Sequence, residues 1–283
     1  MAGVLYIVAT PIGNLEDITI RALRVLREEV NAIACEDTRQ TQKLLEHFQI
    51  RKPMLSYHEH NEASRAAEIV ERLSNGDSIA IVTDAGTPLI SDPGYRAVVA
   101  AIDAGFQVVP LPGASAALTA LAASGLAVDQ FRFIGFLPPK THARRQVFDE
   151  LKTETATVIA YESPHRILES LSDLAEVLGD RRVVLGRELT KLHEEFLRGT
   201  ASEIHAELAA RDSVKGEITL VIGRASEQRV EGDPKDVVSR LEQQGLDRME
   251  AIKAAAKQMG LPKRAVYLAV AEPGNNSPGK RRG

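Results

Sequence analysis

The chain has 283 residues, a formal net charge of −4, and 44% hydrophobic and 26% charged residues, which excludes a disordered or fibrous protein. Two modest domains are expected, because compact domains usually hold about 100 to 200 residues. The single cysteine, Cys35, excludes an internal disulfide, and neither a cleavable leader nor an apolar stretch of about 20 residues is recognised. We expect a cytoplasmic protein without a membrane partner, in which local basic patches would hold any polyanion.

Short runs rich in Val and Ile alternate with longer segments of helical periodicity through the first half of the chain. The predicted strands are 4–9, 32–35, 78–82 and 107–109, and the predicted helices are 19–30, 38–47, 63–74 and 95–104. This alternation indicates crossover units around a mainly parallel sheet that is buried on both faces. An N-terminal α/β domain is therefore expected over residues 1–115.

The second half is again mixed, with longer and less regular connections. A segment rich in small residues, 111–125, is helical in tendency and leads into it. The predicted strands are 131–136, 157–161, 182–186 and 217–222, and the predicted helices are 143–152, 166–178 and 202–210. We expect a C-terminal α/β domain over residues 116–225.

The chain after Gly223 has a different texture. Short helices are predicted at 234–244, 248–259 and 263–270, which gives a helical basic module over 226–272 and a disordered tail over 273–283. The basic residues from position 247 onward are Arg248, Lys253, Lys257, Lys263, Arg264, Lys280, Arg281 and Arg282, against the acids Asp247, Glu250 and Glu272. A phosphate-binding surface and an ordinary solvated helical face both fit this charge pattern.

Several familiar motifs are absent or incomplete. No G-x-G-x-x-G follows a predicted strand, which disfavours a hydride-transfer enzyme. Residues 274–280 match G-x-x-x-x-G-K, but Arg281 replaces the required Ser or Thr and no strand precedes them. His58 and His60 lack a third ligand at a suitable spacing, so no metal site is predicted.

Four polar loops rich in glycine or proline follow predicted strands of the first half. They are ATPIGNLEDIT (9–19), CEDTRQT (35–41), TDAGTPLISDPG (83–94) and LPGASA (111–116). Each loop alone is typical of a turn. Four at equivalent strand ends predict a ligand site, because ligands of open α/β sheets bind outside the carboxyl ends of the strands.

With these loops in view, the chain resembles the tetrapyrrole methylase superfamily, whose members bind S-adenosylmethionine in a cleft between two α/β domains. The stretches that carry the resemblance are VATPIGNLEDIT, ACEDTRQT, HEHNE, IVTDAGTPLISDPG, PLPGASA, FIGFLP, YESPHR, RELTKLHEE and KGEITLVI. Within the superfamily the chain is similar to the branch that methylates the ribose 2′-hydroxyl of a cytidine in the decoding region of 16S ribosomal RNA. The resemblance implies small-subunit RNA or the 30S subunit as substrate, and a homodimer.

The resemblance also implies the cofactor-binding residues. They are Pro11, Asp84, Ala85, Gly86, Thr87, Ser115, Ala116, Tyr161 and Gly216. Small residues suit this role because they let the backbone approach a ligand closely, and a helix starting after Gly113 would offer free N–H groups. Ordinary turn geometry is the alternative explanation for Gly86 and Gly113.

Methyl transfer to a ribose oxygen is an in-line displacement that needs an oriented hydroxyl and a group to take its proton. The candidate catalytic residues at the strand ends are Glu36, Asp37, Arg39, Glu162, His165, Arg166 and Lys191. Helix capping with a local ion pair is the alternative role for Glu36, Asp37 and Arg39. Solvated surface charge is the alternative for Arg166 and Lys191, and the start of a helix after Pro164 is the alternative for His165. Cys35 is expected to be a small core residue. Lys140, Arg144 and Arg145 are expected to contact RNA phosphates.

Two further functions remain open at this stage. One is methylation of a corrin or porphyrin precursor by the same fold, against which CEDTRQT and the basic module argue. The other is a non-catalytic nucleotide-binding regulator, which would not need ionisable groups concentrated at strand ends.

Overall fold

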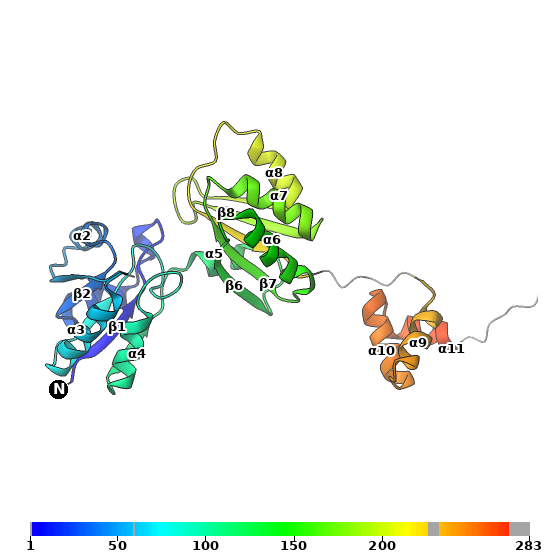
Figure 1. The fold of residues 1–283 in the computed structure, drawn as a ribbon, viewed down its shortest axis with the longest axis horizontal. Helices are drawn as coiled ribbons and strands as arrows, with labels where there is room; N and C mark the ends of the chain where they lie inside the picture. The colour runs from blue at the N-terminus through cyan, green and yellow to red at the C-terminus, as the bar shows by residue number, and fades with distance from the viewer. Residues whose placement is uncertain (1, 59, 226–231, 272–283) are drawn as a thin grey trace, which may run out of the picture. The chain divides into compact units, whose positions relative to one another are not determined.

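The computed structural model describes residues 2–58, 60–225 and 232–271. The chain divides into two compact units, Met1–Arg224 and Ala225–Gly283 (Figure 1). Among the described residues, the first unit holds two five-stranded sheets with their helices, and the second holds three helices. The predicted fold, two α/β lobes followed by a helical module, is confirmed. The predicted disordered tail, 273–283, lies outside the described residues.

The first sheet is parallel throughout. Its strands are β1 (Val4–Val8), β2 (Ala32–Cys35), β3 (Met54–Ser56), β4 (Ile79–Ile81) and β5 (Gln107–Leu111), in the order β3-β2-β4-β1-β5. Its helices are α1 (Ile20–Arg24), α2 (Thr38–His47), α3 (Glu62–Ser74) and α4 (Tyr95–Asp103). Parallel strands end at the same edge of a sheet, so the loops after β1, β2, β4 and β5 meet there.

Both faces of this sheet are covered, as its apolar strands require. On β1, Leu5 and Ile7 belong to the core shared with α3 and α4. Val8 points to the other face, into the core built around α1 and the π-helical turn Val25–Glu29 that continues it. Successive side chains of a strand point to opposite faces, which explains this alternation.

The second sheet is mixed. Its strands are β6 (Phe131–Phe136), β7 (Thr157–Glu162), β8 (Arg182–Arg187), β9 (Glu195–Thr200) and β10 (Ile218–Ile222), in the order β6-β7-β10-β8-β9. The β6–β7 pair is parallel and the other pairs are antiparallel. The helices are α5 (Ala116–Ser124), α6 (Thr141–Glu150), α7 (Ile167–Leu178) and α8 (Ala201–Ala209).

Helices cover the second sheet on both faces as well. Helices α6, α7 and α8 pack on one face, against Val158 and Ala160 of β7. Helix α5 packs on the other face, against Ile159. Ser115, the last residue of the predicted first domain, is the N-cap of α5, and the extents of the two predicted α/β domains stay predictions.

Three local expectations differ from the structure. The helical tendency assigned to 111–125 is wrong at its start, because Leu111 ends β5 and the helix begins only at Ala116, after Pro112 and Gly113. Strands β3 and β9 were not predicted. Both are edge strands of their sheets, and edge strands give a weaker apolar signal than central ones.

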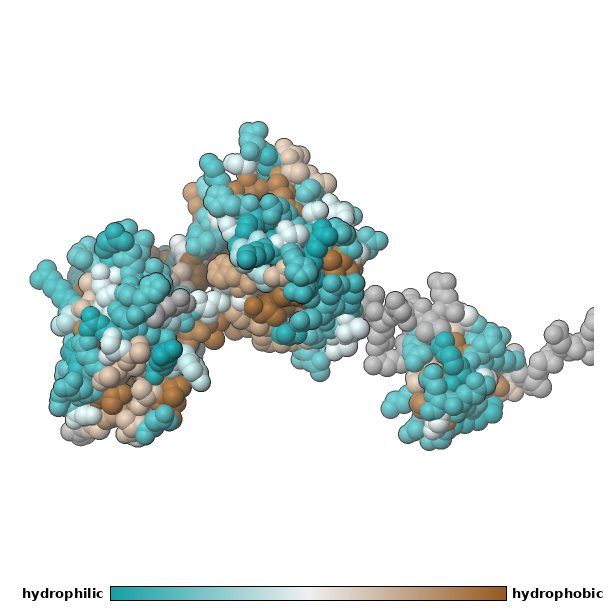
Figure 2. Space-filling model, viewed as in Figure 1, coloured by the Kyte–Doolittle hydropathy of each residue, from teal (hydrophilic) through white to brown (hydrophobic). Residues whose placement is uncertain are grey.

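The second unit is built from α9 (Pro234–Gln243), α10 (Arg248–Met259) and α11 (Lys263–Ala271). These helices share one apolar cluster that includes Val238, Ile252 and Val266. Polar side chains dominate the face of this unit seen in Figure 2. Within the described ranges, no helix is long and apolar enough to cross a membrane.

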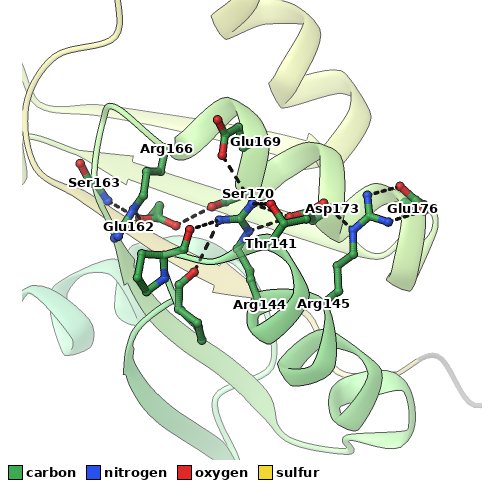
Figure 3. A network of polar contacts seen from close by, with 12 residues as sticks. Thr141, Arg144, Arg145, Glu162, Ser163, Arg166, Glu169, Ser170, Asp173 and Glu176 are labelled. Carbon is green, nitrogen blue, oxygen red and sulfur yellow. Dashed lines mark hydrogen bonds and ion pairs between the residues drawn. The ribbon is translucent and has the colours of Figure 1, made fainter.

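A buried ion pair joins α6 to α7 in the second lobe. The Arg144 side chain is fully buried, and its Nε lies 2.7 Å from Asp173 Oδ2 (Figure 3). Arg145 Nε holds the other oxygen of Asp173 at 2.7 Å and extends the chain of contacts to Glu176. The expectation that Arg144 contacts RNA phosphates is therefore wrong, because its guanidinium faces protein oxygens inside the lobe.

The Arg144→Met variant tests the weight of this ion pair. Removing the cation leaves the Asp173 carboxylate buried with only Arg145 as partner, so the free energy of unfolding should fall by about 3 kcal/mol or more. Urea denaturation followed by circular dichroism measures the change. The control is Lys152→Met, whose partner Asp149 is as exposed as Lys152 itself and whose loss should cost at most about 1 kcal/mol. Equal losses in the two variants would contradict the assignment.

Candidate functional site

A cavity of about 440 Å³ opens at the carboxyl-end edge of the first sheet and is completed by the second lobe. This volume is in the range of small-molecule sites. The first lobe and the start of α5 supply Ile12, Glu36, Asp84, Ala85, Gly86, Thr87, Ile90, Ser91, Asp92, Ser115 and Ala116. The second lobe supplies Phe136, Tyr161, Glu162, Ser163, Pro164, Glu217, Ile218 and Thr219. Loops from both sheets therefore wall one site.

Hydrogen bonds between loops hold the first-lobe wall in place. Thr10 and Gly86 exchange two backbone bonds, from Thr10 N to Gly86 O at 2.9 Å and from Gly86 N to Thr10 O at 3.1 Å. The Thr10 hydroxyl also donates to the carbonyl of Thr83 at 2.9 Å, and the Thr87 hydroxyl donates to the carbonyl of Ala114 at 3.1 Å. The loops after β1, β4 and β5 are thus joined into one wall.

Two glycines are required in this wall for different reasons. Gly86 has a φ of +88°, in the left-handed region that disfavours side chains. Gly113 has ordinary dihedrals, but a Cβ there would lie only 2.6 Å from the Cβ of Ala9. Any side chain at position 113 would push the loop before α5 away from the end of β1.

Most of the residues predicted to bind the cofactor lie around the cavity. Those that line it are Asp84, Ala85, Gly86, Thr87, Ser115, Ala116 and Tyr161. Pro11 and Gly216 are not among the lining residues, although their neighbours Ile12 and Glu217 are. The Ser115 hydroxyl caps α5 by accepting a long hydrogen bond, 3.5 Å, from Leu118 N.

The predicted catalytic residues are less well gathered. Only Glu36 and Glu162 line the cavity, whereas Asp37, Arg39, His165, Arg166 and Lys191 do not. Asp37 caps α2 by accepting from Arg39 N at 2.8 Å, and it pairs with the Arg39 guanidinium at 3.0 Å. These contacts hold the pKa of the Asp37 carboxyl below its usual value. A helix cap with a local ion pair, the alternative role given above for these residues, has the same contacts.

Glu162 is buried at the cavity wall and its oxygens are heavily used (Figure 3). Oε1 accepts from Ser163 N at 2.6 Å and from Arg166 Nη2 at 2.7 Å, and Oε2 accepts from the Ser170 hydroxyl. The arrangement fixes the turn that carries Ser163 and Pro164 into the cavity. Glu162 is therefore placed to orient the wall of the site.

Lys191 connects the two lobes beside the cavity. Its Nζ lies 2.8 Å from Glu188 Oε1 and 3.1 Å from Glu217 Oε2. Burial lowers the pKa of Lys191, but these two carboxylates outweigh it and the net pKa is raised. The aliphatic part of Lys191 covers Gly13, where a Cβ would lie 2.3 Å from Lys191 Cγ. The Lys191 side chain therefore joins the first-lobe loop that contains Gly13 to the second-lobe segments that contain Glu188 and Glu217.

Two carboxylates at the cavity have a raised pKa. Burial raises the pKa of Asp84 and of Asp92, and their mutual proximity adds to the rise at Asp92. The Thr83 hydroxyl opposes part of the rise at Asp92, although its geometry falls short of a hydrogen bond. Asp92 was not among the predicted site residues. The available signal was a second acid in the same strand-end loop as Asp84.

Sequence reasoning also missed other lining residues. They are Ile12, Ile90, Ser91, Phe136, Ser163, Pro164, Glu217, Ile218 and Thr219. Three of them, Ile12, Ser163 and Glu217, directly follow a predicted site residue, so the signal for these positions was present in the sequence. Phe136 is the last residue of a predicted strand, and nothing in the sequence indicated that its side chain would line the cavity.

No described group of three or more His, Cys, Asp or Glu side chains could hold a metal ion. His58 lies beside Asn61 and His60, with 5.9 Å between the two imidazole centroids, and residue 59 lies outside the described ranges. Cys35 is buried, and burial raises the pKa of its thiol. A buried, protonated thiol fits the core role expected for it.

Comparison with known proteins bears on the identity of the site. Residues 4–205 match the family model of Tetrapyrrole (Corrin/Porphyrin) Methylases. The chain is 49% identical over 274 residues to ribosomal RNA small subunit methyltransferase I of Halalkalibacterium halodurans, covering 94% of this chain and 93% of the relative. It is 47% identical to the protein of the same name from Bacillus subtilis, again covering 94% and 93%.

Solved structures agree on the fold. Uroporphyrin-III-C-methyltransferase from Thermus thermophilus superposes with a TM-score of 0.55 at 19% identity, over 79% of this chain and 95% of that one. Diphthine synthase superposes with a TM-score of 0.55 at 13% identity, over 94% and 100%. Sequence match, close relatives and fold coincide, so the chain belongs to the tetrapyrrole methylase family and is a methyltransferase.

Proposed function

We propose that the protein transfers a methyl group from S-adenosylmethionine to small-subunit ribosomal RNA, at the 2′-hydroxyl of a cytidine. The observation that carries the proposal is that TDAGTP and the segments around Ser115 and Tyr161 wall the same cavity. The name shared by the close relatives supports the RNA substrate. The ribose 2′-oxygen and the cytidine rest on the resemblance of the sequence motifs.

The wall residues fit S-adenosylmethionine. Ala85, Gly86 and Ala116 are small enough for backbone groups to approach a ligand, and Asp84 and Asp92 place negative charge where a sulfonium cation would be attracted. When bound, this cofactor supplies an activated methyl group. The residues of the chain then have to hold the acceptor hydroxyl in line, about 3 to 3.5 Å from the methyl, and take its proton.

Asp92 is the strongest candidate for the group that takes the proton. It lines the cavity, and it has no ion pair among the described residues. Asp37, Glu162 and Glu188 are each held by a cation, Arg39, Arg166 and Lys191 respectively. A carboxylate whose pKa is raised by burial is also a stronger base than an ordinary one.

The helical module is the proposed RNA-binding element. Arg248, Lys253, Lys263 and Arg264 are exposed on α10 and α11. Such cations bind phosphates and add affinity without reading sequence. The proposed cytoplasmic location rests on the sequence features described above. The homodimer, and action on RNA or on the assembled 30S subunit, are implied by the family resemblance.

Methylation of a corrin or porphyrin precursor is the competing function. The structural neighbour named uroporphyrin-III-C-methyltransferase is 19% identical, so this likeness supports the fold alone. A non-catalytic regulator no longer competes, because the chain is a methyltransferase.

The direct test is incubation of the protein with methyl-labelled S-adenosylmethionine and small ribosomal subunits that lack the modification. Label is expected at one cytidine of the RNA. The phosphodiester on the 3′ side of that cytidine should resist alkaline hydrolysis, because a 2′-O-methyl group removes the hydroxyl that attacks the phosphate. Label in a macrocyclic precursor instead of RNA would favour the competing function.

The Asp92→Asn variant tests the proposed base. The wild-type single-turnover rate should rise with pH through the raised pKa of Asp92 and then level off, because only the deprotonated carboxylate accepts a proton. Asp92→Asn should lose about 100-fold or more of this rate, together with the pH-dependent step, while cofactor affinity changes little. Asp37→Asn is the matched control and should keep the pH step. An unchanged pH profile in Asp92→Asn would remove Asp92 from this role.

Removal of the chain after Gly223 tests the module. RNA affinity should fall, and its dependence on salt concentration should become less steep, because phosphate contacts release counterions. Affinity for S-adenosylmethionine, measured by calorimetry, should stay the same. Combined Lys253→Gln, Lys263→Gln and Arg264→Gln replacements in the full chain should weaken RNA binding in the same direction. Equal RNA affinity of truncated and whole protein would contradict the assignment.

A further inference from the structure

Two large apolar side chains are exposed at the cavity, one from each lobe. Phe136 at the end of β6 is 60% exposed and Ile90 in the loop after β4 is 47% exposed, and both line the cavity. Neither belongs to the apolar cores of the two lobes. Contact between apolar side chains and water is unfavourable, so exposed apolar residues inside a binding site indicate that a ligand covers them.

Irregular backbone presents both side chains. Ile90 lies between Leu89 and Ser91, whose φ angles of +73° and +69° are rare for residues with side chains. Phe136 follows Gly135, whose φ is +70°, at a register shift between β6 and β7. Strained or bulged backbone is concentrated at ligand sites, where it re-aims side chains.

The two segments lie against each other. A Cβ on Gly135 would be 3.5 Å from the Ser91 hydroxyl oxygen, which is ordinary van der Waals contact. The Phe136 ring is also supported by Tyr161, with 5.4 Å between centroids and 63° between ring planes. Phe136 therefore has a fixed support on one side while most of its surface stays open.

The ligand for such a pair should be flat and apolar on its faces and polar along its edge. The Ser91 and Ser163 side chains line the same cavity and could meet a polar edge. An unpaired nucleobase has this chemistry, and proteins bind unpaired RNA bases by stacking them on aromatic side chains.

We propose that Ile90 and Phe136 form an apolar clamp for the base of the RNA nucleotide that is methylated. The proposal rests on the RNA-methylating function proposed above, and it adds the subsite that holds the base. Stacking on Phe136 fixes the nucleotide, so that its ribose hydroxyl stays within reach of the methyl donor. The clamp should therefore contribute to the affinity for RNA and not to the affinity for the methyl donor.

The absence of tryptophan from the sequence allows a direct test. Phe136→Trp introduces the only tryptophan of the chain into the clamp, and its fluorescence can be followed separately from that of the five tyrosines. The protein is first saturated with S-adenosylhomocysteine, and unmodified small-subunit ribosomal RNA transcribed in vitro is then added. Stacking should quench the fluorescence on addition of RNA. Phe131→Trp is the control, because Phe131 is 47% exposed on the same strand but does not line the cavity.

Kinetics on small ribosomal subunits give an independent reading. Phe136→Ala and Ile90→Ala should raise KM for the subunit, about 5- to 100-fold for Phe136→Ala, and leave the Kd for S-adenosylmethionine unchanged. Phe136→Tyr should retain most of the affinity. Ile102→Ala, at a 57% exposed position of α4 outside the cavity, should behave as wild type.

Three results would overturn the clamp. Quenching by S-adenosylhomocysteine alone, with a raised Kd for S-adenosylmethionine in Phe136→Ala, would make the ring part of the donor site. Dissociation of an oligomer by Phe136→Ala would make it an interface between copies. An unchanged KM for the small ribosomal subunit in Phe136→Ala would show that the Phe136 ring does not hold the base. If the wild-type protein methylates no subunit, the proposed function fails, whereas RNA-dependent quenching at position 136 would still support a base subsite.

Discussion

The reciprocal backbone bonds between Thr10 and Gly86 are the constraint on which the site depends. They tie the loop after β1 to the loop after β4 at the one edge where all parallel strands of the first sheet end. The close approach of Gly113 to Ala9 adds the loop before α5 to the same wall. With three loops joined, the small residues of TDAGTP present their backbone to the cavity, and the second lobe closes it.

Charged side chains around the cavity divide into two groups. Asp37, Glu162 and Lys191 are engaged in caps and ion pairs, and through these they orient turns and join loops. Asp84 and Asp92 line the cavity and have no ion pair among the described residues, and burial raises the pKa of each. The same separation explains why acids close in sequence have different roles: the partner within reach, and not the residue type, decides which carboxylate remains able to accept a proton.

The sequence predicted most central elements because their signals are local. Helix α2 was predicted with its observed bounds, since Asp37 caps an amphipathic segment, and strand β6 likewise. Strand β9 was missed because Glu195 and Arg198 interrupt its apolar pattern. The loops of the site were found, but the burial of Arg144 was not, because its partner Asp173 lies on the next helix. Phe136 was missed for a similar reason, since a bulge in the backbone turns it toward the cavity.

Hydrogen–deuterium exchange of the whole protein with and without S-adenosylhomocysteine tests the central claim most directly, because it reports which backbone segments the donor covers. The account predicts slower exchange at residues 10–13, 84–92, 113–118 and 217–219. It predicts no change at 232–271 or in the second hollow beside β3, which is lined by residues between Gln42 and Met54. Protection at 42–54 with none at 84–92 would contradict it.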